Sequence, residues 1–485
     1  MYSVAGYAEW GRNPIFSELN NYSKVSLGFA SQNLRSAISI FGHTFLVFHN
    51  EEAPEANSLL VEFTGEAPDL SSSLSALFLS VPGKYSLNYL AEKRREYDGE
   101  NRSLWLYRLS FNEERLHQLK QFLLQSEREK YLYDFSQKNC AFYIAKALEK
   151  SGKELRFGRE IFVSPVNTLR WTQAANMIVS ATYLPSTQLR ATLEYDALSP
   201  SQQQIIENYF KYSPTQNLSD GANKNAISVI AEHLIPSEGD ANRRNFLFAL
   251  KREFPISAAH TEMKAKDPAR SPSAGLLSAQ WLPQKNAALV SISPGFINLD
   301  NEAFFDQKNA TVQVLKTVLM IEGAGRVSLN QFQLINIESN QPSEYLREGF
   351  TQAFDMSYTN YRMHLNKNYA ENKLTFGRGV SYFIGSHVIS ALPLGAVVFS
   401  SQDSGSSSLA QIEMRLNLYK QLTDKTAYTI QITQSTSSAF EIKQTVNLDL
   451  VSAIGKGQSV SFNARQVSGA EQASTLTGIR LTTAF

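Results

Sequence analysis

The segment Tyr131–Gly152, YLYDFSQKNCAFYIAKALEKSG, contains Cys140, the only cysteine among the 485 residues of the chain. Apolar residues recur at helical spacing after the cysteine, and Gly152 is a typical stop signal for a helix. Upstream of the cysteine, Asp134, Ser136 and Asn139 are all residue types that can cap a helix. We therefore predict that Cys140 lies in the first turn of an amphipathic helix.

The first turn of a helix favours a reactive thiol. Free backbone N–H groups and the helix dipole stabilise a thiolate there, and a lowered pKa makes a cysteine nucleophilic. The alternative, and on residue type alone the commoner case, is that a lone cysteine is a small buried hydrophobic residue. The upstream stretch FGHTFLVF favours the reactive thiol, because it offers a histidine.

Composition excludes several classes of function. Lys plus Arg (46) nearly balances Asp plus Glu (45), and no nucleic-acid-binding motif occurs, so we expect no nucleic-acid partner. One cysteine rules out an internal disulfide or a cysteine-rich metal site, and the seven histidines are scattered without metal-binding spacing. We therefore expect neither a metal ion nor another cofactor.

Residues 1–180 combine strand and helix patterns, which predicts a domain that mixes both. Ala37–His49 is rich in Ile, Phe and Val, which predicts a strand that carries His43. Ser58–Gly65 predicts the next strand, in which successive side chains alternate between two faces and Glu62 lies on one of them.

Residues 181–274 change to a helical pattern. Ser199 and Pro200 form a good N-cap and first helical position. Asn223–Leu234 and Ala241–Phe254 predict further helices. This region is interpreted as a small helical linker domain.

Residues 275–485 change again, to alternating apolar and polar residues, with Ile412, Met414 and Leu416 as one example. We count about 10–12 such segments of roughly ten residues between turn signals, which predicts an antiparallel β-barrel of the outer-membrane type. The alternative is a soluble β-sandwich, which also alternates. Charges on the polar side suit a lumen, and the last strand ends in Phe485, which resembles the terminal strand of bacterial outer-membrane barrels.

Export is implied by an outer-membrane barrel. The amino terminus lacks the basic and apolar regions of a signal peptide, so we expect the sequence to begin after a removed one. No apolar run reaches the roughly 20 residues of a membrane-spanning helix.

A nucleophilic cysteine needs a base within hydrogen-bonding reach and a group that orients this base. His43 is the best candidate base for Cys140, because each of the other histidines has a plainer interpretation as a strand-end or helix-surface residue, or lies outside the domain.

GHTFLVF followed by YDFSQKNCAFYIAKAL resembles the Lnb N-terminal periplasmic domain family of bacterial envelope proteins. VEFTGE, Tyr85–Tyr89 and RSLWLYRLSFNEERLHQL fit the same resemblance, which covers roughly residues 25–175. Histidine before cysteine, and asparagine directly before cysteine, are also similar to the circularly permuted NlpC-like papain superfamily, which includes lecithin–retinol acyltransferase. The resemblance implies an α+β permuted papain-like fold for this domain.

Members of this family characterised as Lnb transfer an acyl chain from the diacylglyceryl-cysteine of a lipoprotein to its α-amino group. The resemblance therefore implies that Cys140 is the nucleophile and His43 its base. Glu62 is our first choice for the orienting residue, and its alternative role is that of a surface strand residue.

Three further residues have two interpretations each. Asn139 either donates to an oxyanion or caps the helix. Tyr131 and Tyr133 either line an acyl groove as substrate-binding residues or belong to the core.

We therefore expect a cell-envelope cysteine acyltransferase that acts on lipid or lipoprotein acyl chains through a Cys140 thioester. The front domain would be periplasmic and the barrel would lie in the outer membrane. One alternative is a cysteine hydrolase, namely a lipase, a thioesterase or a peptidoglycan amidopeptidase. The other is a barrel channel or assembly protein with an inactive front domain.

Overall fold

The computed structural model describes residues 15–33, 39–50, 57–66, 80–155, 157, 160–212, 224–253, 267–270, 275–298, 310–323, 325–343, 346, 349–360, 369–402, 405–423, 425–437, 442–455, 458–468 and 473–484. The chain forms two compact units, which are Met1–Gly158 with Thr168–Ala269 and Arg159–Asn167 with Arg270–Phe485.

A seven-stranded antiparallel sheet forms the centre of the first unit, with the strand order β6-β4-β3-β2-β1-β5-β7. The strands are β1 (Lys24–Ala30), β2 (His43–His49), β3 (Leu59–Gly65), β4 (Val81–Tyr89), β5 (Leu104–Leu109), β6 (Tyr131–Tyr133) and β7 (Ile178–Leu184). A short 3-10 helix, Phe16–Asn21, precedes them.

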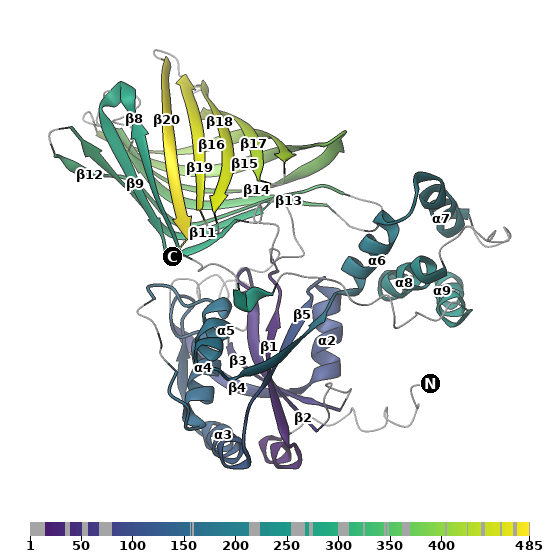
Figure 1. The fold of residues 1–485 in the computed structure, drawn as a ribbon. Coiled ribbons are helices and arrows are strands. Elements are labelled where there is room, and N and C mark those ends of the chain that lie inside the picture. Colours follow the sequence, from purple (N-terminus) through teal and green to yellow (C-terminus); the bar gives the residue numbers. More distant parts are fainter. Residues whose placement is uncertain are drawn as a thin grey trace. The chain divides into compact units, whose positions relative to one another are not determined.

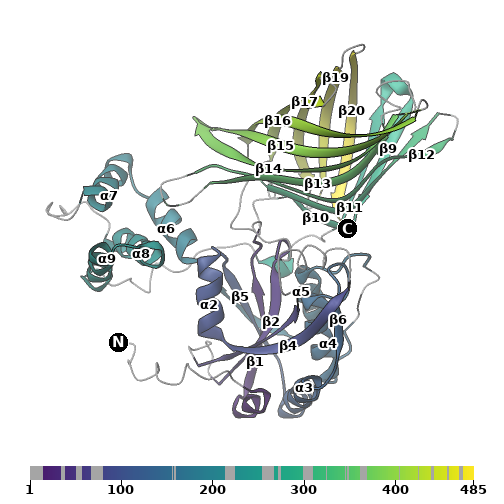
Figure 2. The ribbon, with the colours of Figure 1, turned by 180° about the vertical axis from the view of Figure 1, so that it is seen from behind.

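Helices cover both faces of this sheet. They are α2 (Leu90–Gly99), α3 (Glu113–Ser126), α4 (Cys140–Lys150) and α5 (Pro165–Ala174). α2 lies on one face, and α3, α4 and α5 lie on the other (Figures 1 and 2). The predicted α+β class is confirmed, while the permuted papain-like topology stays a prediction.

The strand predicted at Ala37–His49 begins later than expected. Residues 34–38 lie outside the described part of the chain, and Ser39–Phe41 form a turn that leads into β2 at His43. Gly42 has a φ of +90°, and an added Cβ would lie 2.7 Å from the carbonyl oxygen of Ala30. A glycine is therefore required at this position, and it determines where the strand begins.

β1 was missed by the sequence analysis, although it lies beside β2 in the sheet. Its sequence, KVSLGFA, alternates apolar residues in a way that could have revealed it. Gly28 of β1 lies opposite Phe45, and an added Cβ there would come within 2.0 Å of the phenyl ring. The two strands therefore fit closely only because residue 28 has no side chain.

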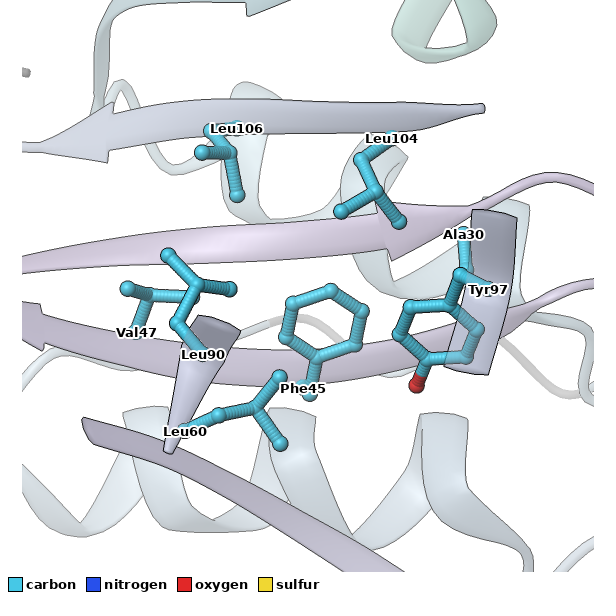
Figure 3. Close-up of a cluster of buried hydrophobic side chains, with 8 residues drawn as sticks. All are labelled: Ala30, Phe45, Val47, Leu60, Leu90, Tyr97, Leu104 and Leu106. Atoms are coloured by element: carbon cyan, nitrogen blue, oxygen red, sulfur yellow. The ribbon is translucent and has the colours of Figure 1, made fainter. Parts of the chain in front are cut away.

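A cluster of buried side chains fixes β2 on the face covered by α2 (Figure 3). Phe45 lies in the middle of it and stacks on Tyr97 of α2 with 5.8 Å between ring centroids. Burial of one such phenyl side chain contributes about 1.5–3 kcal/mol. The members are Ala30, Phe45, Val47, Leu60, Leu90, Tyr97, Leu104 and Leu106.

The helical region forms α6 (Thr187–Asp196), α7 (Pro200–Tyr212), α8 (Lys224–Leu234) and α9 (Ala241–Glu253). α7 begins at Pro200, as Ser199 and Pro200 predicted. The domain boundary predicted after residue 180 falls inside β7, and the contacts group the helical region with the first unit. Among the described helices, none combines the length and the apolarity needed to cross a membrane.

The strands of the second unit form a closed antiparallel barrel. They are β8 (Leu276–Leu282), β9 (Ala287–Ser293), β10 (Gly295–Asn298), β11 (Ala310–Glu322), β12 (Val327–Gln341), β13 (Phe350–Asn360), β14 (Tyr369–Ile384), β15 (His387–Gln402), β16 (Gly405–Thr423), β17 (Thr426–Ser437), β18 (Ile442–Gly455), β19 (Gln458–Ser468) and β20 (Ala473–Ala484).

Pairing of β9 with β11 closes the ring, and β10 pairs further along the same strand. Over the described residues, twelve strands make up the ring, namely β8, β9 and β11 to β20. Figure 1 shows them as one curved wall. The predicted barrel of about 10–12 strands is confirmed.

The barrel is polar inside and apolar outside. Ile412 is 76 % exposed, whereas the next residue along β16, Glu413, is 2 % exposed. Phe376, Ile384 and Phe399 are exposed like Ile412. A soluble sandwich buries its apolar face, so this inverted pattern excludes the sandwich alternative and is typical of a membrane barrel.

We predict that Ile412→Lys destabilises the barrel in lipid by about 2–4 kcal/mol, because an ammonium group on the lipid-facing surface is poorly solvated. Leu422→Lys, at the end of the same strand, is the matched control with an expected effect of about 0–1 kcal/mol. Urea unfolding of the full chain in lipid vesicles measures both variants, and equal effects would contradict the orientation described here.

Candidate active site

Cys140 is the first residue of α4, as predicted. Asn139 has extended backbone angles and caps the helix, since its side-chain oxygen accepts the N–H of Phe142 at 3.3 Å. The amide nitrogen of the same side chain donates to the carbonyl of Phe135 at 3.0 Å. Both ends of the Asn139 side chain are therefore used in the cap. Its predicted role as an oxyanion donor stays a prediction.

His43 begins β2, and Glu62 lies on the neighbouring strand β3, opposite Phe45. The Nε2 atom of His43 lies 3.0 Å from the Oε2 atom of Glu62. The side chain of His43 also forms a hydrogen bond with Cys140. Because Nε2 faces Glu62, Nδ1 is the ring nitrogen that remains for the sulfur. The structure thus brings the three residues into one chain of hydrogen bonds.

The cysteine and the carboxylate come from opposite faces of the sheet. Glu62 is joined by Lys93, which belongs to α2 on one face. The next residue, Phe63, stacks on Tyr143 of α4 at 3.8 Å between ring centroids. Cys140 and Glu62 therefore meet only through the imidazole of His43, which lies at the start of β2.

Burial raises the pKa of the Cys140 thiol, but the neighbouring His43 lowers it more, through its charge and its hydrogen bond. Backbone N–H groups of Thr44 and Ala141 add to this lowering. The net pKa of Cys140 lies below its ordinary value, although the residue is only 7 % exposed. A thiolate is therefore favoured at this position.

Burial alone lowers the pKa of His43, but the charges and hydrogen bonds of Cys140 and Glu62 overcome it and raise the pKa to about 9. Burial likewise raises the pKa of Glu62, but His43 and Lys93 more than offset it and lower the pKa to about 2. At neutral pH the site therefore holds an imidazolium on His43 and a carboxylate on Glu62, beside a cysteine whose pKa is shifted toward the thiolate form.

Glu62 is 4 % exposed, so the alternative of a surface strand residue is excluded. Its second oxygen, Oε1, accepts hydrogen bonds from Asn88 at 3.0 Å and from Lys93 at 2.9 Å. These two residues were missed as members of the site. No sequence motif marks Lys93 as a site residue, because Lys93 reaches Glu62 only through the packing of α2 on the sheet.

α5 holds the first turn of α4 in place. The Thr168 hydroxyl, at 0 % exposure, donates to the carbonyl oxygen of Ala141 at 2.8 Å. Within the described residues, no group of three or more His, Cys, Asp and Glu side chains is arranged to hold a metal ion.

Tyr131 and Tyr133 belong to a cluster of aromatic side chains around Phe63. Tyr133 is buried, and the charge of Cys140 is among the causes that raise its pKa well above the ordinary value, burial being the largest. Tyr131 is partly exposed and contacts the ring of Tyr143 at 5.3 Å. Both tyrosines therefore contribute to packing, and their role in an acyl groove stays a prediction.

Residues 13–174 match the family model described as the Lnb N-terminal periplasmic domain. This segment is an Lnb N-terminal periplasmic domain. Cys140, His43 and Glu62 all lie within it, and the predicted family resemblance is confirmed. No curated protein matches the chain.

Solved structures that resemble the chain are outer-membrane proteins. An outer membrane channel from Pseudomonas putida F1 has 10 % identity and a TM-score of 0.29, and covers 47 % of this chain and 100 % of its own. An anion-selective porin from Comamonas acidovorans has 8 % identity and a TM-score of 0.22, and covers 44 % of this chain and 98 % of its own.

The barrel assignment rests on strand pairing and on the apolar outer surface. A periplasmic domain followed by such a barrel places the protein in the Gram-negative envelope, with the Lnb domain in the periplasm and the barrel in the outer membrane. The predicted location is therefore confirmed.

We predict that Cys140 reacts with iodoacetamide at pH 7 much faster than an ordinary thiol. His43→Asn should slow this reaction, since loss of the imidazole raises the cysteine pKa and lowers the thiolate fraction at pH 7. Mass spectrometry of the alkylated full chain gives the rates. A thiol that stays unreacted at pH 7 in the unaltered protein would count against the thiolate.

We predict that Glu62→Gln lowers the pKa of His43 from about 9, because a neutral amide no longer stabilises the imidazolium. Titration of labelled histidine followed by NMR measures the change. Glu66→Gln is the matched control, because Glu66 is a half-exposed carboxylate that pairs with Lys84 rather than with the site. An unchanged pKa in the Glu62 variant would show that Glu62 has no part in holding the proton.

Proposed function

We propose that this protein is a cell-envelope cysteine acyltransferase that takes an acyl chain from a lipid or lipoprotein and carries it as a thioester on Cys140. The observation that carries the proposal is the hydrogen-bonded chain from Cys140 through His43 to Glu62. A thiolate, a base and a group that orients the base are the requirements for covalent catalysis by cysteine.

In the first half-reaction the Cys140 thiolate attacks the carbonyl carbon of an acyl ester. Backbone N–H groups at the start of α4 are suited to stabilise the oxyanion that develops, because they point out of the helix terminus. As the ester C–O bond breaks, His43 gives its Nδ1 proton to the departing alkoxide. The products are an alcohol, a thioester on Cys140 and a neutral imidazole.

In the second half-reaction an amine attacks the thioester carbonyl, and neutral His43 takes the proton that the amine loses. The C–S bond breaks, the thiolate returns, and an amide is released. Glu62 keeps the imidazole in one orientation through both steps and favours its protonated form, while Lys93 and Asn88 hold the carboxylate.

Two observations support a lipid-borne substrate. The family of the front domain is periplasmic, and the resemblance to members characterised as Lnb implies a lipoprotein substrate. Covalent attachment to a membrane barrel keeps the domain near the bilayer, where acyl esters are concentrated. The preference for an amine acceptor over water follows from the family resemblance.

We predict that the purified full chain, incubated with a diacylated lipopeptide, acquires an acyl mass on Cys140 and releases an N-acylated lyso-lipopeptide. Mass spectrometry detects both species. Cys140→Ala should abolish the acyl adduct and the product, because no other thiol is present in the chain. Released free fatty acid without N-acylation would instead identify a hydrolase. Absence of any adduct or product would favour a barrel protein with an inactive front domain.

The rate of this reaction should fall above pH 9. The pKa of His43 is raised to about 9, so the imidazolium that protonates the leaving alcohol is present below that pH and lost above it. Glu62→Gln should move this fall to lower pH. We would record pH–rate profiles of single-turnover acylation for the unaltered chain and for Glu62→Gln. The rate of the variant should fall at a lower pH than the rate of the unaltered chain.

A further inference from the structure

A set of polar side chains crosses the interior of the barrel. The carboxylate of Glu338, on β12, accepts hydrogen bonds from Arg415 at 2.8 Å and from Asn417 at 3.0 Å, both on β16. Three strands, β13, β14 and β15, separate β12 from β16 along the wall. Four strand steps amount to roughly 19 Å of wall, so these contacts cross the lumen as a chord over four of the twelve strand steps and do not follow the wall.

The crossing is reinforced from the strand beside β16. Ser390 of β15 donates to Asn340 of β12 at 2.8 Å, and Asn417 donates to the same Asn340 oxygen at 3.3 Å. We call Glu338, Asn340, Ser390, Arg415 and Asn417 the lumen bridge. Its members are connected to one another through side-chain hydrogen bonds, and among the described residues only the Nε atom of Arg415 within this set is buried without a partner.

The side chains of the lumen bridge are largely shielded from solvent. The side chains of Arg415 and Glu338 are 14 % and 16 % exposed, and Asn417 and Ser390 are buried. In a water-filled lumen, polar side chains that point inward would be accessible to solvent. Here other side chains cover them.

Apolar side chains fill the space next to the lumen bridge. Ala353, Leu392 and Leu394 form a buried cluster inside the barrel. Ala353 lies opposite Glu338 in the strand register, and Leu392 lies opposite Arg415. The polar bridge and this apolar cluster therefore occupy the same level of the lumen.

Strand number alone does not decide whether a barrel conducts. About eight strands leave room only for side chains, whereas 16–18 strands enclose an aqueous channel. A twelve-stranded ring lies between these sizes, so the side chains that point inward determine the outcome. In this barrel, long charged and amide side chains meet across the interior.

We propose that the lumen bridge closes the barrel, so that the barrel anchors the Lnb domain in the outer membrane without forming an open diffusion pore. This inference is independent of the acyltransferase proposal, because it involves only residues of the barrel. Loss of Glu338 removes the acceptor shared by Arg415 and Asn417 and leaves the guanidinium without its counter-charge. Water and ions then enter the lumen at this level.

The test is electrical recording of the full chain in planar lipid bilayers of defined phospholipid in KCl solution. The unaltered protein should show no steady conductance, and Glu338→Ala should produce one. The charge-exchanged double variant, Glu338→Arg with Arg415→Glu, restores the ion pair and should return the barrel to the closed state. Arg326→Ala is the matched control, because it removes an exposed ion pair with Glu322 outside the lumen bridge.

Each outcome decides the proposal. Steady conductance of the unaltered protein would overturn it, as would a Glu338→Ala variant that folds as a heat-modifiable barrel but stays closed. If the Glu338→Ala variant fails to fold, Arg415→Ala replaces it in the test. The proposal is then supported when the unaltered protein shows no conductance and Arg415→Ala shows a steady one. An Arg415→Ala variant that migrates on gels as a folded barrel but shows no conductance contradicts the proposal.

Discussion

The hydrogen-bonded contact between the Cys140 sulfur and the His43 imidazole is the interaction on which the functional proposal depends. It requires α4 and β2 to begin at the same end of the sheet, with the cysteine on one face and the carboxylate on the other. Gly42 makes this possible, because its positive φ and its close approach to Ala30 allow β2 to begin at the histidine. A thiolate and an imidazolium then stabilise each other in a buried position.

Each unit of the chain holds a shielded carboxylate, Glu62 or Glu338, whose two oxygens both accept hydrogen bonds. A buried charge is tolerated when its remaining hydrogen-bonding positions are filled, and it is strongly destabilising when one partner is lost. Glu62 is held by His43, Asn88 and Lys93, and Glu338 is held by Arg415 and Asn417. In the Lnb domain the arrangement favours one protonation state, and in the barrel it joins strands that are not neighbours.

Much of the organisation could be predicted from local patterns. The helix after Cys140 and the start of α7 at Pro200 depend on residues close together in the sequence, so spacing and capping rules predict them, whereas the structure chose Asn139 among three possible cap residues. The barrel was predictable from its repeated alternation. β1 was missed although its alternating sequence could have revealed it, whereas the late start of β2 depends on the close approach of Gly42 to Ala30 on the neighbouring strand.

The sequence by itself determined that one thiol lies at a helix start, that one histidine is available on a strand upstream, and that the second half alternates with the period of a strand. These are properties of residue type and spacing. Only the tertiary structure decided that Glu62 is buried beside His43, that Lys93 and Asn88 complete its hydrogen bonds, and that Glu338 meets Arg415 across the lumen. The physical reason is that pKa values and buried ion pairs depend on distances between residues far apart in the chain, and folding alone sets those distances.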